Sequence, residues 1–209
     1  MASADYQDIR TSLLMAYDSA ADRRDDQVKQ PWKLAEREQF LGRLRAEQCT
    51  RLLEIGAGTG QDSAFFAGHG LEVVATDMSP EMVARCRDKG LDARVMDFSE
   101  LRFEPESFDA VHAMNCLLHV PNTELPAVLA AIATVLRPGG LLFAGVYGGR
   151  AEEGSAGWDD HVPARFFSFR TDGQLMHYAS QSFEIVDFHV VETESEHRFQ
   201  SLTLRRRAT

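Results

Sequence analysis

The stretch LLEIGAGTG, residues 52–60, places glycines at every second position directly after a short apolar run. A glycine inside a strand or helix costs roughly 0.5–1 kcal/mol relative to alanine, so three of them so close together indicate a sharp turn that something approaches closely. The glycines are Gly56, Gly58 and Gly60, and an acid, Glu54, precedes them. The stretch therefore predicts a strand, a glycine loop and the start of a helix, with a ligand against the loop.

Length and composition indicate one globular domain over residues 1–209. The chain has 44% hydrophobic and 26% charged residues, which are ordinary values for a soluble globule. Its formal net charge of −10 argues against a nucleic-acid surface. We see no apolar run long enough to cross a membrane and no signal-peptide pattern at the start, and the three cysteines follow no disulfide or metal spacing. We therefore expect a cytoplasmic protein.

Strand-like and helix-like segments alternate along the chain. Strands are predicted over 50–55, 71–77, 91–97, 108–115, 141–147, 183–191 and 197–204. The helices between them are predicted from about residue 60, from 80, over 123–137 and over 171–180. Such alternation is typical of a parallel sheet with helices on both faces. The last two strands are joined by only five residues, so they must be antiparallel.

An acid at the end of the second predicted strand indicates what the glycine loop binds. Asp77 lies about 20 residues after Gly56, the spacing at which an acid binds ribose hydroxyls in nucleotide-binding folds. A tight turn with a solvated Asp77 is the alternative. The spacing G-x-G-x-G differs from the dinucleotide pattern G-x-G-x-x-G, and Glu54 suits a cationic ligand better than a phosphate.

On these residues the chain, over about positions 45–205, resembles the class I S-adenosylmethionine-dependent methyltransferases. The resemblance implies a Rossmann-like, doubly wound α/β fold. Its mostly parallel seven-stranded sheet would end in an antiparallel C-terminal hairpin, under a helical N-terminal cap over residues 1–45. It implies S-adenosylmethionine as cofactor and S-adenosylhomocysteine as product. The cofactor-binding residues that it implies are Glu54, Gly56, Ala57, Gly58, Thr59, Gly60, Asp77, Met78, Asp97, Phe98, Asn115 and Cys116.

The resemblance also implies roles for several of these residues. Asp77 would bind the ribose, Met78 would pack on the adenine, and Asp97 with Phe98 would hold the adenine amino group. Met78 could equally be a packing residue at a helix start, and Asp97 alone could be a surface acid. Asn115 and Cys116 would offer backbone carbonyls to the amino acid moiety of the cofactor.

Methyl transfer needs a base only when the acceptor is protonated, and two histidines are candidates. His119 follows the fourth strand, near the expected position of the methyl group, and His161 lies in a lid loop predicted over 149–170 on the acceptor side. With the ordinary histidine pKa of about 6.5, a His119 base would lose activity as the pH falls through that value. The candidate acceptor-binding residues are Trp158, Tyr147, Tyr17 and Trp32, with core packing as the alternative for Tyr17.

The leading hypothesis is therefore a methyltransferase that acts on a small-molecule or short-peptide acceptor, at oxygen. A protein that binds S-adenosylmethionine without methyl transfer, as a sensor or for a sulfonium-assisted reaction, is the alternative. The glycine spacing disfavours a nicotinamide reductase. We expect no metal, since no metal-ligand spacing is present, and no nucleic-acid or membrane partner. The sequence leaves open whether the protein is a monomer or a dimer.

Overall fold

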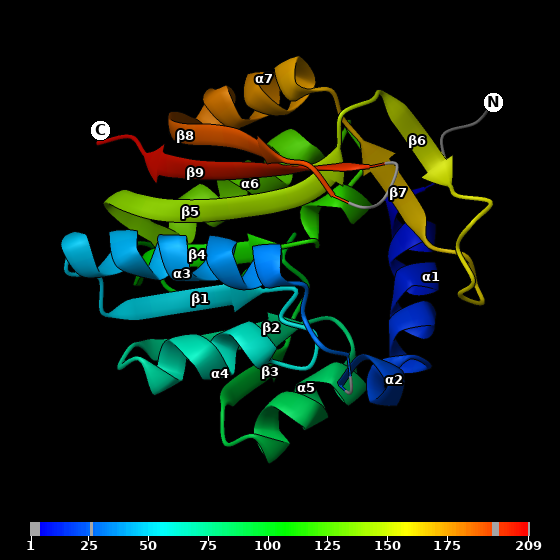
Figure 1. Cartoon of the computed structure of the whole chain (residues 1–209), viewed down its shortest axis with the longest axis horizontal. Coiled ribbons are helices and arrows are strands. Elements are labelled where there is room, and N and C mark those ends of the chain that lie inside the picture. The colour runs from blue at the N-terminus through cyan, green and yellow to red at the C-terminus, as the bar shows by residue number, and fades with distance from the viewer. Residues whose placement is uncertain (1–4, 26, 194–196, 209) are drawn as a thin grey trace.

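The computed structural model describes residues 5–25, 27–193 and 197–208, which form a seven-stranded sheet flanked by helices (Figure 1). The strand order is β3-β2-β1-β4-β5-β9-β8. The strands are β1 (Arg51–Ile55), β2 (Glu72–Asp77), β3 (Asp92–Val95), β4 (Phe108–Met114), β5 (Leu136–Gly148), β8 (Phe183–Val191) and β9 (Arg198–Arg206). β1 to β5 are parallel, whereas β9 is antiparallel to both β5 and β8. The predicted mostly parallel sheet with its C-terminal hairpin is confirmed.

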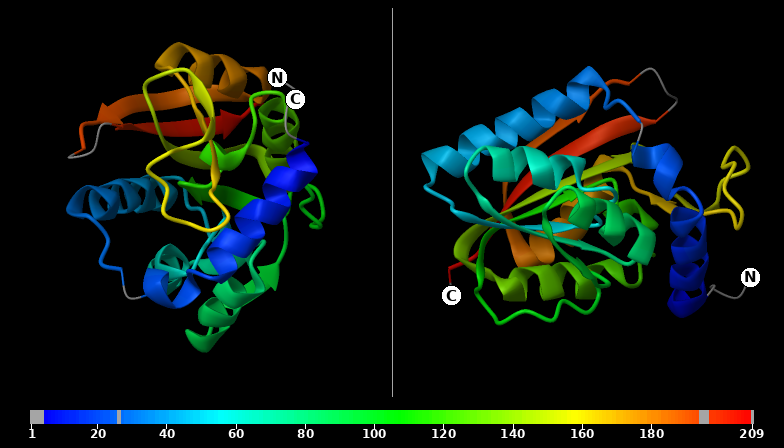
Figure 2. Two further views of the ribbon diagram at one scale, coloured as in Figure 1. Left: turned by 90° about the vertical axis from the view of Figure 1, so that its right-hand side faces the viewer. Right: turned by 90° about the horizontal axis from the view of Figure 1, so that it is seen from below.

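Helices cover both faces of this sheet. On one face lie α3 (Pro31–Ala46) and α4 (Gln61–Gly68), and on the other lie α6 (Leu125–Val135) and α7 (Asp172–Ser182) (Figure 2). α5 (Pro80–Asp88) packs on β2 and β3. α5 begins at a capping residue, since the Ser79 hydroxyl accepts the Met82 N–H.

The position of α3 differs from the predicted N-terminal cap. Its residues Phe40, Leu41 and Leu44 are almost fully buried in one apolar cluster with Leu52 and Phe66, which belong to β1 and α4. α3 is therefore part of the layer that covers the sheet. Of the three N-terminal helices, α1 (Tyr6–Asp18) and α2 (Ala21–Asp25) lie across the carboxyl ends of the strands (Figure 1).

The predicted lid loop contains regular structure. β6 (Glu152–Ser155) and β7 (Phe166–Phe169) pair as a separate antiparallel two-stranded sheet, so the prediction of a loop is wrong for the residues of these two strands. Residues 149–170 are called the lid segment below. The residues between the two strands lie at the same end of the main sheet as α1 (Figure 2). A short 3-10 helix, η1 (Leu117–His119), follows β4 and packs against β5 and β7.

The helix predicted up to Arg137 is two residues shorter in the structure. α6 ends at Val135 because Leu136 already pairs with Phe108 as the first residue of β5. Pro138 and the glycines after it lie in the strand rather than after a helix end. No helix in the described parts of the chain has the length and apolar character needed to cross a bilayer.

Candidate functional site

The glycine loop between β1 and α4 lies at the carboxyl edge of the sheet. Gly56 has φ +60°, and a Cβ there would lie 2.4 Å from the Cβ of Cys116. Gly58 has φ +55°, but a Cβ there would meet no heavy atom within 4 Å. Both positions therefore require the left-handed conformation that glycine adopts at little cost. Gly56 also allows β4 to approach, whereas Gly58 presents bare backbone to open space.

Asp77, at the end of β2, holds this loop in place. Its carboxylate accepts the backbone N–H of Gly58 at 2.8 Å and that of Ser79 at 2.9 Å. Burial raises the pKa of Asp77 above its ordinary value, although these two hydrogen bonds act in the opposite direction. A buried carboxylate beside the glycine backbone can still accept further hydrogen bonds, because each oxygen has a second lone pair.

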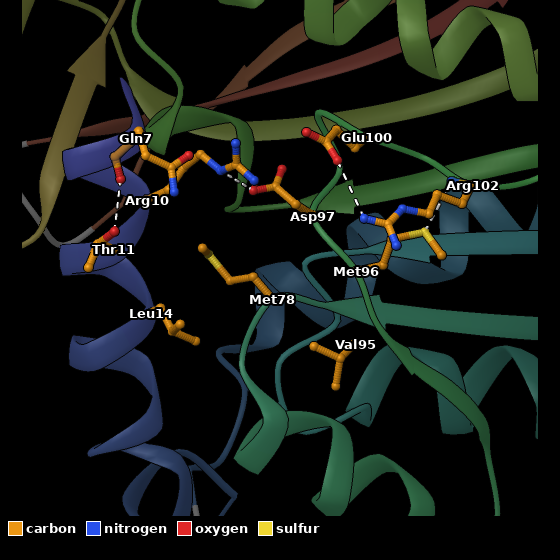
Figure 3. A pocket seen from close by; sticks show the side chains of 10 residues that line it. All are labelled: Gln7, Arg10, Thr11, Leu14, Met78, Val95, Met96, Asp97, Glu100 and Arg102. Carbon is orange, nitrogen blue, oxygen red and sulfur yellow. Dashed lines mark hydrogen bonds and ion pairs between the residues drawn. The ribbon is translucent and has the colours of Figure 1, made fainter. Parts of the chain in front are cut away.

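Three adjoining hollows follow this edge of the sheet. The largest, of about 370 Å³, lies between the α2–α3 segment and the glycine loop. A central hollow of about 90 Å³ shares Gly56 and Gly58 with it and is also lined by Asp77, Phe98 and Asn115. A third, of about 280 Å³, adjoins the central one at Met78 (Figure 3). Together they form an elongated path that passes the loop and the end of β2.

The third hollow lies between α1 and the end of β3 (Figure 3). Arg10 of α1 forms an ion pair of 2.5 Å with Asp97, and the backbone N–H of Ser99 donates to the same carboxylate at 2.7 Å. Arg10 is a site residue that the sequence analysis missed. Its only signal was its place in the predicted helical N-terminal cap, and nothing in the sequence pairs it with Asp97.

Glu54 lies in the large hollow, but its carboxylate is engaged inside the protein. It accepts a hydrogen bond from the Ser63 hydroxyl and lies 3.2 Å from Nδ1 of His112. The nearby Asp62 is paired with Lys29 and with Arg37. Glu54, Asp62 and His112 bring their ligand atoms within 4.8 Å of one another, but Asp62 is already neutralised by the two cations.

β4 ends at Met114, and the two residues that follow it, Asn115 and Cys116, line the central hollow. Asn115 has φ +57°, and its N–H donates to the carbonyl of Gly145 at 2.7 Å. Its side-chain Oδ1 is buried and has no hydrogen-bond partner among the described residues. An unpaired buried acceptor is costly, so this atom points to a ligand donor in the hollow. Thr59 lines the large hollow, and Gly60 begins α4.

His119 ends η1 and lines the central hollow together with Tyr17. Its Nδ1 lies 2.6 Å from the carbonyl oxygen of Phe166, which can only accept, so Nδ1 carries the proton. Nε2 lies 2.5 Å from the Tyr17 hydroxyl and accepts from it. Burial lowers the pKa of His119 to about 3. The expectation of an ordinary histidine pKa is therefore wrong, and the ring is uncharged at neutral pH.

His161, the second candidate base, is outside the three hollows. Its Nδ1 lies 2.9 Å from Asp159, and its Nε2 lies 3.3 Å from Arg23 of α2. Asp159 also accepts from Arg165, whose Nη1 donates to the Tyr17 hydroxyl at 3.3 Å. This network connects the lid segment with α1 and α2. These contacts hold the lid segment against the two N-terminal helices α1 and α2. Sequence reasoning did not identify Arg165.

The other predicted acceptor residues are divided between two places. Trp158 is 55% exposed and packs on Phe167 of the lid, outside the three hollows. Trp32 and Tyr147 meet edge to face, with ring centroids 6.1 Å apart, at the start of α3 and the end of β5. Lys33, which sequence reasoning missed, lies over both rings and lines the large hollow.

Comparisons with known proteins agree with this geometry. A family model described as a methyltransferase domain matches residues 52–140, which run from the glycine loop to β5. Over 100 residues the chain is 41% identical to the ubiquinone biosynthesis O-methyltransferase of Xanthomonas campestris pv. campestris, covering 44% of this chain and 41% of that enzyme. Over this region the chain is therefore similar to methyltransferase domains. The aligned region thus spans less than half of that curated relative.

Solved methyltransferases share the fold over nearly the whole chain. The 1,6-didemethyltoxoflavin-N1-methyltransferase of Burkholderia thailandensis, crystallised with S-adenosylhomocysteine, has a TM-score of 0.77 at 22% identity and covers 100% of this chain and 93% of its own. The magnesium protoporphyrin IX methyltransferase of Synechocystis PCC 6803, also with S-adenosylhomocysteine, has a TM-score of 0.72 at 16% identity, covering 95% and 99%. The exposed backbone of Gly58 and the unpaired Oδ1 of Asn115 fit such a ligand.

Proposed function

We propose that the chain transfers a methyl group from S-adenosylmethionine to a hydroxyl oxygen of a small-molecule acceptor. The observation that carries this proposal is the uncharged imidazole of His119, which lines the central hollow beside the glycine loop and Asp77. A hydroxyl must lose its proton when it is methylated, and an uncharged imidazole with Nδ1 fixed as a donor offers Nε2 as the acceptor.

The chain's residues would divide this work as follows. The cofactor supplies an electrophilic methyl group on a positively charged sulfur, which becomes neutral when the group leaves. The acceptor hydroxyl would replace Tyr17 as the hydrogen-bond donor to Nε2 of His119 and then transfer its proton there. Burial disfavours a positive charge on His119, but the total positive charge in the site does not rise. α1 and the lid segment exclude water and hold the reactants, which is where most of the rate enhancement of such a transfer arises.

Two further observations support an acceptor of this kind. The curated relative with 41% identity is named as an O-methyltransferase. The residues around the central hollow also include apolar side chains to which no cofactor role is assigned, Leu13 and Met114. Such apolar side chains suit a small aromatic or apolar acceptor.

The test is an assay of the purified protein with S-adenosylmethionine and a panel of phenols, catechols and arylamines, with products identified by mass spectrometry and NMR. We expect methyl ethers. His119→Ala should lower kcat by about 10²–10⁴-fold, the usual effect of removing a general base, and should leave the S-adenosylhomocysteine affinity near that of the wild type.

His161→Ala is the matched control, because this histidine lies outside the hollows and its loss should have little effect on kcat. Exclusive formation of N-methyl products would contradict the oxygen assignment. A His119→Ala variant with normal turnover would show that His119 takes no proton. Tight cofactor binding without any methylated product over a broad panel would favour a protein that binds the cofactor for another purpose.

A further inference from the structure

The face of α3 that meets the sheet carries one carboxylate among aromatic rings. Trp32, Glu36 and Phe40 follow one another at four-residue spacing, which places them on one side of the helix. Trp32 packs on Phe199 of β9, with ring centroids 4.6 Å apart. Phe40 packs on Phe143 of β5 at 5.4 Å. Glu36 lies between these two contacts and is only 7% exposed, so its carboxylate needs partners that replace water.

The partners of Glu36 come from the C-terminal hairpin of β8 and β9. One carboxylate oxygen accepts the Ser201 hydroxyl at 2.5 Å, and the other lies 3.0 Å from Nε2 of His189. Nδ1 of His189 in turn lies 2.8 Å from the carboxylate of Asp187. An ionised carboxylate can only accept a hydrogen bond, so a nitrogen beside it must carry a proton to form one. Both hydrogen bonds of His189 therefore form together only when its imidazole is doubly protonated and positively charged.

The charges around His189 favour this form. A small cavity beside it is also lined by Glu36 and Arg43 of α3. β9 and β5 contribute uncharged residues to this cavity: Ser201, Thr203 and Phe143. Burial disfavours the charged imidazole, but the hydrogen bonds to Glu36 and Asp187 outweigh it and raise the pKa of His189 above its ordinary value. The side chain of His189 is 34% exposed, so its proton can exchange with solvent.

Loss of this proton would leave one ring nitrogen with a lone pair that faces a carboxylate oxygen. Two acceptors cannot form a hydrogen bond, so one of the two contacts must open. Asp187 lies on the same strand as His189, so the contact that opens by movement of an element is the one between His189 and Glu36 of α3. Glu36 would then keep only the Ser201 hydroxyl, and a buried carboxylate with fewer partners is costly.

The position of α3 matters for the candidate site, because the start of this helix forms one wall of the large hollow. Gln30, which precedes α3, and Lys33 in its first turn both line that hollow opposite the glycine loop. A change in how α3 is attached to the hairpin therefore changes the shape of the hollow.

We propose that His189 is a pH-sensitive switch, whose protonated form holds α3 against the C-terminal hairpin and keeps the wall of the large hollow in place. Loss of the proton to solvent loosens α3 and weakens the binding of the cofactor. The effect on the cofactor rests on the proposed function, since it takes the large hollow to hold part of S-adenosylmethionine. A group whose pKa is higher in the folded than in the unfolded protein stabilises the fold at low pH, and this contribution is lost as the pH rises through the folded value.

Urea unfolding at pH 6 and at pH 9 tests the attachment of α3. Between these values the unfolding equilibrium constant of the wild type should rise, relative to that of His189→Gln, by about tenfold for each unit by which folding raises the pKa of His189. Glu36→Gln should remove most of this rise, because it keeps the shape of the side chain without its charge. His177→Gln is the matched control, because this exposed histidine of α7 has the amide of Gln181, and not a carboxylate, at its Nε2.

Two further measurements use the same proteins. An NMR titration of the His189 ring, assigned by its absence in His189→Gln, should give a pKa above the ordinary value of about 6.5. Calorimetry with S-adenosylhomocysteine should show that the wild type loses affinity between pH 6 and pH 9 by a larger factor than His189→Gln does. Titration of the ligand itself affects both proteins equally and cancels in this comparison.

A pKa of His189 at or below about 6.5 in the folded protein would overturn the switch, as would a stability difference between the wild type and His189→Gln that does not change with pH. Equal losses of affinity in the two proteins would contradict the effect on the cofactor. None of these measurements involves methyl transfer. Both pH effects in a protein that methylates nothing would sustain the inference and contradict only the proposed function.

Discussion

At the scale of single residues, two glycines of the same loop have the same backbone conformation but different surroundings. Gly56 and Gly58 have φ of +60° and +55°, so an alanine at either position is strained by about 1–2 kcal/mol. At Gly56 the new methyl group would also collide with Cys116, whereas at Gly58 it would enter open space. The two substitutions therefore separate a packing role from a ligand-binding role.

We expect Gly56→Ala to lower the free energy of unfolding more than Gly58→Ala, because only the former adds a clash with Cys116 to the backbone strain. Gly58→Ala should leave a folded protein that binds S-adenosylmethionine at least tenfold more weakly. Urea unfolding and calorimetry measure the two effects. A stable Gly58→Ala protein with unchanged affinity would show that the ligand does not approach this backbone.

The pKa of His119 gives a second prediction at this scale. Burial keeps it near 3, so the imidazole stays uncharged from pH 8 down to pH 5. We expect kcat to show no loss from protonation of His119 over this range. An ordinary pKa of about 6.5 would instead lower the rate about tenfold per pH unit below that value. A pH–rate profile of kcat at saturating cofactor, compared with that of His161→Ala, distinguishes the two.

At the scale of elements, the buried Arg170 at the end of β7 fixes the short helix that carries His119. Its guanidinium donates to Oδ1 of Asn122 at 2.8 Å and to the carbonyls of Leu117, Val120 and Ser168. It is 1% exposed, and burial lowers its pKa to about 10. One side chain thus binds the backbone oxygens of the first residue of η1, Leu117, and of Val120, the residue that follows η1.

Replacing Arg170 with methionine should lower the free energy of unfolding by about 3 kcal/mol or more, since several buried acceptors lose their donor at roughly 1–3 kcal/mol each. Arg170→Lys should recover part of the loss. Urea unfolding measures both variants. The Arg170→Met variant should also have a lower kcat at temperatures where it remains folded, because η1 and His119 are displaced. Stability near that of the wild type would show that water replaces the guanidinium.

How far the sequence predicted the structure also depends on the element. The short apolar segments at 50–55 and 71–77 predicted β1 and β2 nearly to the residue, because a parallel strand buried on both faces is a nearly continuous apolar run. The pairing of β6 with β7 has no such signal, since EEGS at 152–155 shows no apolar alternation. Likewise, whether α3 caps the site or covers the sheet depends on the distant contacts of Phe40 and Leu44.

The same distinction holds within the candidate site. Gly56, Gly58 and Asp77 could be predicted because they follow strands whose carboxyl ends meet at one edge. Lys33 and Arg165 could not be predicted, since they come from the segments that cover the site. Their positions depend on contacts with Tyr147 and Asp159, and sequence spacing does not indicate these.

At the scale of the whole molecule, α1 and the lid segment cover the site from two sides and meet at one side chain. The Tyr17 hydroxyl lies 2.5 Å from Nε2 of His119 and 3.3 Å from Nη1 of Arg165, so it joins α1 to both η1 and the lid. Figure 1 shows these covers at the carboxyl end of the sheet, where the central hollow lies.

We expect Tyr17→Phe to increase the dissociation rate of S-adenosylhomocysteine about fivefold, because a hydrogen bond that must break on opening contributes about 1 kcal/mol. Stopped-flow measurement of product release tests this. Tyr6→Phe, at the other end of the same helix, should have little effect. An unchanged rate in Tyr17→Phe would show that ligands leave without separating α1 from the lid.

The contact between Tyr17 and His119 has a kinetic consequence. The hydrogen bond from the Tyr17 hydroxyl, which holds α1 against η1, is accepted by Nε2 of His119, the same nitrogen atom that would receive the proton of the acceptor. An acceptor that binds in the reactive pose therefore breaks the hydrogen bond between Tyr17 and His119. When the product departs, this hydrogen bond can form again and α1 returns to its place over the site. Each catalytic cycle would then contain one opening of the molecule, so the turnover number could not exceed the rate of that motion.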